Sequence, residues 1–285
     1  MFSRKQLAKL ILPLVVEQFL AMTIGIADTL MVANCGEAAV SGISLVDSIN
    51  ILLINIFSAL ATGGAIVCSQ YIGKEQPENA RKAAKQLVLI TAVLSVAIMV
   101  ACLLSQRGLL RVLFGSIEDA VMENAVTYLF LSALSYPFIA VYNAGAALFR
   151  SMGNSKISMY ASLMMNIVNV GGNALLIFGF QMGVAGAGLA SLVSRMLAAV
   201  FVLYLLRNQK NLIYIEHWMH WKPNFDMMKN ILRIGIPTGL ENGMFQIGKI
   251  LVASLITLAF SLCIERLLTR KVHGINMVEA LKSVE

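Results

Sequence analysis

Two acidic residues, Glu17 and Asp28, lie in the first apolar segment of this 285-residue chain. At 100° per residue in a helix, their separation of eleven residues places both side chains within about 20° of one face. A carboxylate inside a bilayer costs about 2.5 to 3.5 kcal/mol on insertion scales, so such a group usually has a function. Burial favours the protonated carboxyl group and a nearby cation favours the ionised one. We therefore predict that Asp28 binds a transported proton or sodium ion, with Glu17 as a further candidate. The alternatives are a solvated helix end for Asp28 and a position near the inner interface for Glu17.

Uncharged polar side chains form a second group of candidates, in a long segment without charged residues. Asn166, Asn169 and Asn173 are spaced by three and four residues and therefore share one side of a helix. An asparagine oxygen can accept a hydrogen bond from a protonated carboxyl group or coordinate a hard cation. The alternative is structural, because amides also join transmembrane helices. Asn143 and Ser191, on neighbouring segments, are weaker candidates.

The composition places these residues in a membrane. Apolar residues make up 58% of the chain and charged residues only 13%, whereas soluble domains carry about 25% charged residues. Several uncharged stretches reach the roughly 18 to 20 residues that a helix needs to cross the hydrocarbon core. The sequence therefore excludes a single soluble domain and predicts an all-α polytopic membrane protein. The seven expected spans cover residues 10–32, 47–72, 87–104, 125–149, 157–180, 184–206 and 231–256.

The basic residues between the spans predict the orientation. Fourteen Lys and Arg residues fall in the N-terminus, in the segments after the second, fourth and sixth spans and, for Arg233, at the start of the seventh span, whereas only Arg107 and Arg111 fall in the other loops. Because cytoplasmic loops are enriched in basic residues, we expect a multi-pass plasma-membrane protein with a cytoplasmic N-terminus. This pattern explains the net charge of +7, so the charge does not indicate nucleic acid as a partner.

A short internal repeat divides the chain. Residues 9–18 and 233–242 share the pattern basic-x-x-x-Pro-x-x-x-Glu-amide, which aligns Glu17 with Glu241 and makes Glu241 a further candidate for the cation site. Parallel repeats of six spans are a known transporter plan, although proline and basic residues are also favoured at helix starts. The expected parts are a six-span lobe over 1–206, a cytoplasmic interfacial linker over 207–230, the first helix of a second lobe over 231–256 and a basic tail over 257–285.

Motifs for catalysis and metal binding are missing from the sequence. It has no H-E-x-x-H, G-x-S-x-G or Walker A motif, and its four cysteines form no C-x-x-C pair. His217 and His220 could form a metal pair, but two histidines are a weak site, and an interfacial helix with neighbouring tryptophans explains them better. We predict neither an enzyme nor a bound metal or cofactor, apart from the transported H⁺ or Na⁺.

Short motifs occur in most of the expected spans and in the loops after them. They are Asp28-Thr-Leu-Met-Val with Gly36-Glu-Ala-Ala-Val, Ser58-Ala-Leu-Ala-Thr-Gly-Gly-Ala with Ser69-Gln-Tyr-Ile-Gly, Tyr136-Pro-Phe with Asn143, Arg150 and Gly153-Asn-Ser, Asn166-x-x-Asn169-x-x-x-Asn173, and Gly183-Val-Ala-Gly-Ala-Gly. Over roughly residues 1–256 the chain resembles the multidrug and toxic compound extrusion (MATE) family of transporters. The resemblance implies a six-helix MATE-like lobe plus a seventh transmembrane helix.

By this resemblance, the N-terminal lobe holds a cation site formed by Asp28, Asn143, Asn169 and Ser191. Relatives often carry aspartate where this chain has Asn173, so the resemblance favours proton coupling through Asp28 over sodium coupling. It implies antiport that expels small amphipathic or cationic compounds, in a lipid bilayer. Because the family has two lobes, we expect this chain to be an incomplete half-transporter that needs a second lobe for activity.

Two other functions stay open. A lipid-linked oligosaccharide flippase has a related architecture, and basic residues lining the cavity would favour it. Residues 261–285 resemble the C-terminal end of ABC-exporter permeases of the macrolide and lipoprotein-release type, which suggests a permease fragment. The basic residues of this tail contradict the positive-inside rule, because it follows a span that should end outside. We therefore expect a truncated or fused reading frame.

Overall fold

The computed structural model describes residues 4–115, 117–215, 223–245 and 248. The chain forms two compact units, Met1–Gly239 and Leu240–Glu285. All regular structure in the described residues is helical, as predicted. The elements are α1 (Arg4–Val32), the short 3₁₀ turn η1 (Ala33–Cys35), α2 (Glu37–Gly73), α3 (Pro77–Phe114), α4 (Asp119–Ser151), α5 (Ser155–Asn173), the π-helical turn η2 (Ala174–Gly179), α6 (Gly183–Leu206) and a helix over 225–245.

The helices confirm the polytopic membrane fold. Within the described residues, five are long and apolar enough to cross a membrane: α2, α3, α4, α5 together with η2, and α6. Helix α1 contains a shorter apolar segment, Ile11–Leu20. The predicted seventh span begins inside the helix over 225–245, and most of its last ten residues lie outside the described part. The predicted interfacial helix around Trp218 and the tail over 257–285 also lie outside it.

Two helices begin ten residues before their predicted spans. Helix α2 begins at Glu37 rather than Asp47, and α3 begins at Pro77 rather than Leu87. Gly36 precedes α2 with a φ of 100°, a conformation that glycine adopts readily, and the charge of Glu37 suits a helix N-terminus. Proline is favoured in a first turn because its missing N–H is not needed there. The predicted bounds follow the apolar residues of each span, whereas the helices continue beyond them.

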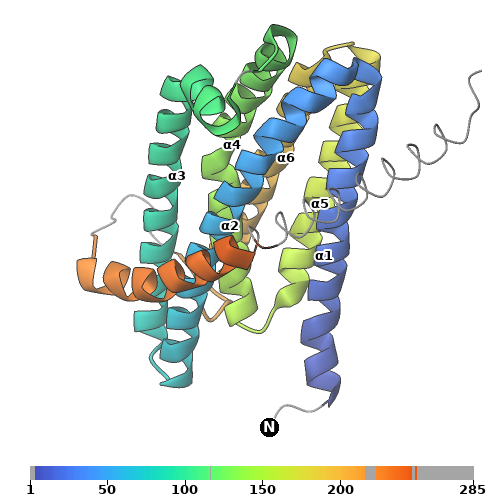
Figure 1. Ribbon diagram of the computed structural model, residues 1–285. Helices are drawn as coiled ribbons and strands as arrows, with labels where there is room; N and C mark the ends of the chain where they lie inside the picture. Colours follow the sequence, from blue (N-terminus) through green and yellow to red (C-terminus); the bar gives the residue numbers. More distant parts are fainter. Residues whose placement is uncertain (1–3, 116, 216–222, 246–247, 249–285) are drawn as a thin grey trace, which may run out of the picture. The chain divides into compact units, whose positions relative to one another are not determined.

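The helices of the first unit do not pack in sequence order (Figure 1). Helix α1 lies against α5, α5 against α6, α6 against α4 and α4 against α2, while α3 packs on both α2 and α4. Gly42 allows α2 and α4 to approach closely, because a Cβ atom there would lie 2.9 Å from the backbone nitrogen of Ala125. Phe57 and Tyr136 are fully buried between the same helices, with ring centroids 6.2 Å apart. Two halves result, α1–α5–α6 and α2–α3–α4, joined through α4 and α6.

The backbone is irregular next to the asparagines of the fifth span. Helix α5 ends at Asn173, and the chain continues into the π-helical turn η2. Such π-helical turns occur frequently at functional sites. The short turn between the expected spans 157–180 and 184–206 is confirmed, since η2 ends at Gly179 and α6 begins at Gly183, whose φ is 55°.

Candidate functional site

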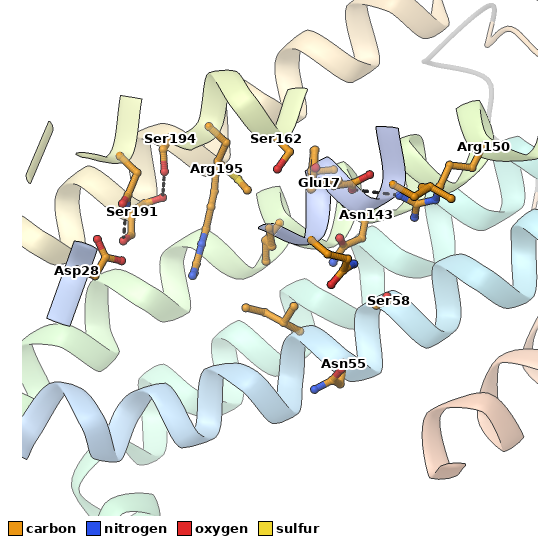
Figure 2. Close-up of a pocket in the computed structure, with 17 residues that line it drawn as sticks. Glu17, Asp28, Asn55, Ser58, Asn143, Arg150, Ser162, Ser191, Ser194 and Arg195 are labelled. Atoms are coloured by element: carbon orange, nitrogen blue, oxygen red, sulfur yellow. Dashed lines mark hydrogen bonds and ion pairs between the residues drawn. The ribbon is translucent and has the colours of Figure 1, made fainter. Parts of the chain in front are cut away.

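A cavity of about 600 Å³ lies inside the first unit, between residues of α1, α2, α4, α5 and α6 (Figure 2). Its polar lining residues are Glu17, Gln18, Asp28, Asn55, Ser58, Tyr142, Asn143, Arg150, Ser162, Asn169, Ser191, Ser194 and Arg195, and its apolar ones are Leu14, Ile54, Ile139 and Met165. Glu17 and Asp28 both face the cavity, as their spacing on one helix predicts. The structure therefore brings together residues from both halves of the unit.

Asp28 is held in place by α5. The Nδ2 amide of Asn173 donates a hydrogen bond to Oδ1 of Asp28. Asn173 is fully buried, and its own Oδ1 has no hydrogen-bond partner among the described residues. One turn earlier, Nδ2 of Asn169 donates to Oγ of Ser191 in α6 over 3.1 Å. Helices α1, α5 and α6 thus meet at one group of polar side chains, which we call the Asp28 cluster: Asp28, Asn169, Asn173 and Ser191.

Glu17 is paired at the other end of the cavity. Nη1 of Arg150, near the end of α4, lies 3.2 Å from Oε1 of Glu17. Oγ of Ser158 in α5 donates to the second carboxylate oxygen over 2.8 Å. Figure 2 shows this pair and Asp28 on opposite sides of the lining residues. The two acids of α1 therefore differ, because Glu17 has a fixed positive partner and Asp28 is bonded by an uncharged amide.

Asp47 is a half-buried acid that sequence reasoning missed. Nδ2 of Asn50 donates to its Oδ1 over 3.1 Å, and the Tyr128 side chain is hydrogen-bonded to it as well. The Tyr136 hydroxyl donates to Oδ1 of Asn50 over 2.9 Å. Because α2 begins at Glu37, Asp47 lies in the third turn of the helix and not at its end. Gly36 and Glu37 are typical of a helix start, and they could have shown from the sequence that Asp47 lies inside the helix.

Arg195 brings a permanent positive charge from α6 into the cavity. Its Nη1 donates to Oγ of Ser135 in α4 over 2.6 Å. The guanidinium also interacts electrostatically with both Asp28 and Asp47. Within the described residues, the one ion pair shorter than 4.0 Å joins Arg150 and Glu17. Arg195 therefore acts on the two aspartates from a greater distance.

The other predicted residues fall in different places. Asn143 lines the cavity, and its Nδ2 has no partner in the described part of the chain. Asn166 is buried on the predicted side of α5 and donates to the backbone oxygen of Ser162. Glu241 belongs to the second unit, so its part in a cation site stays a prediction. Among the described residues, no three His, Cys, Asp or Glu side chains are placed to hold a metal ion.

Comparison with known proteins identifies the family. Residues 13–175 match the MatE family model. The chain is 28% identical over 274 residues to the uncharacterized transporter YisQ of Bacillus subtilis, covering 93% of this chain and 58% of that protein. It is 26% identical over 265 residues to the probable multidrug resistance protein NorM of Thermotoga maritima, covering 90% and 55%. The chain thus spans little more than half the length of these relatives.

Solved structures share the fold. An outward-facing multidrug resistance MATE family transporter of the MOP superfamily superposes with a TM-score of 0.79 at 22% identity, covering 86% of this chain and 54% of that one. A MATE structure in the bent conformation gives the same TM-score of 0.79 at 23% identity, covering 87% and 55%. Because the matched family segment covers more than half of the sequence and runs from α1 into η2, this multi-pass membrane protein belongs to the MATE family of transporters and is not an enzyme.

Proposed function

We propose that this lobe binds a coupling cation at Asp28 and amphipathic, often cationic compounds in the adjoining cavity. The lobe would then take part in secondary active efflux driven by a proton or sodium gradient. The observation that carries the proposal is the position of Asp28, which lines a cavity of about 600 Å³ and is hydrogen-bonded by the buried Asn173. An intramembrane carboxyl group with an uncharged partner can change its charge without breaking an ion pair.

The cavity suits compounds with an apolar body and a positive group. Its volume of about 600 Å³ lies within the range of small-molecule sites, about 300 to 1,000 Å³. Leu14, Ile54, Ile139 and Met165 provide an apolar surface, and methionine adapts to ligands of different shape. Asp28 supplies a negative charge that would attract both a cationic compound and a coupling ion. Competition between the two for one cavity would couple their movements.

Loading of Asp28 would change how α1 is held by α5. An ionised Asp28 accepts the hydrogen bond that Asn173 donates. A protonated Asp28 can instead donate to the Oδ1 of Asn173, which has no partner among the described residues. Because α1 packs on α5, two protonation states favour two arrangements of these helices. A ligand that binds one arrangement better shifts the population toward it.

A lipid-linked oligosaccharide flippase is the second candidate, since Arg150 and Arg195 both line the cavity. Each arginine is offset by acids, however. Arg150 pairs with Glu17 over 3.2 Å, and Arg195 interacts with Asp28 and Asp47. The cavity therefore presents no unbalanced positive charge to an anionic lipid headgroup, which favours efflux. The third interpretation, a permease fragment, depends on residues 261–285, which lie outside the described residues.

The proposal can be tested by ethidium efflux from cells that lack their own pumps. We expect no efflux above an empty-vector control from the 285-residue chain alone, because it spans little more than half of the relatives' length. Joined to the second lobe of a complete relative, it should export the dye. In that fusion, Asp28→Asn should reduce export at least about tenfold, which corresponds to about 1.4 kcal/mol.

The matched control is Asp119→Asn, which removes an exposed acid at the start of α4 and should leave export unchanged. Full export by the Asp28→Asn fusion would exclude Asp28 as the coupling group. An envelope defect in a knockout strain without dye sensitivity would instead support the flippase. Clear efflux by the 285-residue chain alone would show that a second lobe is not needed.

A further inference from the structure

We propose that Arg195 is a built-in counter-ion of the cation site and that it makes the site take a proton in preference to a metal cation such as sodium. The inference rests on the proposed role of Asp28 in coupling, and it adds the residues that decide which ion is accepted. Those residues are Arg195 and Asp47, together with the amide of Asn173.

Arg195 lies between the Asp28 cluster and a second group of polar side chains around Asp47 and Asn50. On α6 it lies one turn after Ser191, which belongs to the Asp28 cluster. Its Nη1 donates to Ser135 in α4 over 2.6 Å. Ser135 lies one turn after Ser132, whose Oγ is 3.4 Å from Nδ2 of Asn50. Asn50 in turn donates to Asp47 over 3.1 Å. Figure 2 shows Arg195 extending from α6 on the same side of the cavity as Asp28 and Ser191.

The charged groups around Arg195 carry one more negative charge than positive charge when both aspartates are ionised. Two carboxylates, Asp28 and Asp47, face one guanidinium, which is always protonated. Tyr128 from α4 is hydrogen-bonded to Asp47 and also faces this group, and a buried tyrosine hydroxyl is neutral near pH 7. The α5 side chains that hold Asp28 are amides. Glu17 and Arg150 cancel each other at the far end. One monovalent cation therefore completes the charge balance.

A proton is a better choice than a metal ion for the monovalent cation that balances these charges. When a proton binds a carboxylate, the charge disappears and no new cation faces the guanidinium. A sodium ion would keep its full charge opposite Arg195, and like charges repel strongly in a poorly solvated site. Hard metal cations also need several oxygen ligands. Asn173 and Asn169 instead present their Nδ2 groups to Asp28 and Ser191.

The unpartnered oxygen of Asn173 supports the same conclusion. Asn173 is fully buried, and its Oδ1 has no partner in the described part of the chain. An aspartate at this position would offer only acceptors while ionised, whereas the amide can donate to an ionised Asp28 and accept from a protonated one. The same side chain therefore satisfies both protonation states of Asp28, as a proton site requires.

The experiment measures ion binding on the purified 285-residue chain in detergent, at about pH 8. Thermal unfolding is followed by circular dichroism, with sodium chloride raised from about 1 to about 100 mM and choline chloride keeping the ionic strength constant. We expect no sodium-dependent shift for the wild type. Arg195→Met removes the guanidinium but keeps an apolar side chain of similar length, and its midpoint should rise by about 3 °C or more with sodium.

Three variants make the test specific. Arg195→Lys keeps the charge and should behave like the wild type. Arg207→Met removes an exposed charge at the end of α6 and should show no sodium response. Adding Asp28→Asn to Arg195→Met should abolish the response. Sodium stabilisation of the wild type, or a folded Arg195→Met variant that ignores sodium, would overturn the inference.

A direct readout covers the case in which Arg195→Met does not fold. Infrared difference spectra of the wild type should show a protonated carboxyl group appearing on acidification, and Asp28→Asn should lose that band. Its absence from the wild type would overturn the inference. Failure here is distinguishable from failure of the proposed function. A wild type stabilised by sodium, together with Asp28-dependent efflux by the two-lobe fusion, would reject the role of Arg195 alone.

Discussion

The guanidinium of Arg150 donates to the carboxylate of Glu17 over 3.2 Å and so joins the end of α4 to α1. Ser158 of α5 donates to the second carboxylate oxygen over 2.8 Å. The Glu17 side chain is only 14% exposed, so these partners replace much of its contact with water. The Glu17 half of α1 is therefore fastened to two other helices by an ion pair and a hydrogen bond, whereas Asp28 accepts its hydrogen bond from an uncharged amide. This difference favours Asp28 over Glu17 as the group that changes partners during transport.

Removing the positive partner of Glu17 should destabilise the lobe. We expect Arg150→Met to lower the free energy of unfolding by about 1 to 3 kcal/mol, between the values of exposed and fully buried ion pairs. The Arg150 side chain is 30% exposed, which excludes the larger values. Thermal unfolding of the purified chain in detergent would measure the change.

A double-variant cycle separates the ion pair from lost packing. Glu17→Gln combined with Arg150→Met leaves no unpaired carboxylate, so it should recover at least about half of the lost stability. If Arg150→Met unfolds like the wild type, the ion pair contributes nothing to the stability of the lobe.

Cys35 tests the predicted orientation. It lies in η1, between α1 and α2, whereas Cys68 and Cys102 are buried within helices. With the N-terminus in the cytoplasm, η1 faces outward. An impermeant maleimide added to intact cells should therefore label a variant that keeps Cys35 as its only cysteine. Labelling of this variant only in inverted vesicles would show the opposite orientation.

The same cysteine should react slowly at neutral pH. Partial burial raises the pKa of the Cys35 thiol, so its thiolate fraction at a given pH is smaller than that of an exposed cysteine. Because the thiolate is the nucleophile, the labelling rate should rise about tenfold per pH unit below that pKa. A rate that levels off near pH 8 would contradict the raised pKa.

Gly63 should be essential for seating the helix over 225–239 on α2. A Cβ atom on Gly63 would lie 2.6 Å from the backbone nitrogen of Gly235 and 2.8 Å from the backbone oxygen of Ile231. Backbone atoms cannot rotate away, so Gly63→Val should destabilise the unit by about 1 to 3 kcal/mol. Gly73→Val is the matched control, because a Cβ atom there meets nothing within 4 Å. Equal unfolding midpoints of the two variants would mean that the close contact is not formed.

Much of the fold follows from simple patterns in the sequence. Long uncharged runs are sufficient to predict membrane helices, since no other regular structure satisfies the backbone in lipid apart from a closed barrel. Spacing is sufficient to predict that Glu17 and Asp28 share a face, and both line one cavity. Spacing also predicts the common side of Asn166, Asn169 and Asn173, which are all buried.

The partners across helices could not be predicted in the same way. The contact of Arg195 with Ser135 joins residues that are 60 positions apart, and Arg150 and Glu17 are 133 apart. Such pairs depend on which helices are neighbours, and here the neighbours do not follow the order of the chain. Asp47 was missed for a local reason, because hydropathy marks where lipid contact begins and not where the helix begins. The arginine partners of the acids in the cavity are therefore visible only in three dimensions.

A second acid beside Asp28 should create a sodium response without any change at Arg195. Asn173→Asp replaces the amide that donates to Asp28. When both carboxyl groups are ionised, it adds one negative charge, the same net change as the loss of Arg195. Two touching carboxylates repel, so one keeps its proton unless a cation lies between them. We expect the unfolding midpoint of Asn173→Asp to rise by about 3 °C with sodium in the circular dichroism assay.

Asn34→Asp, at an exposed position in η1, is the control and should not respond to sodium. The comparison with Arg195→Met then separates charge from ligand geometry. If both site variants respond, the net charge around Asp28 decides which ion is accepted. If Arg195→Met responds and Asn173→Asp does not, removal of the guanidinium matters in itself, because the new carboxylate supplies oxygen ligands but leaves Arg195 opposing the metal ion.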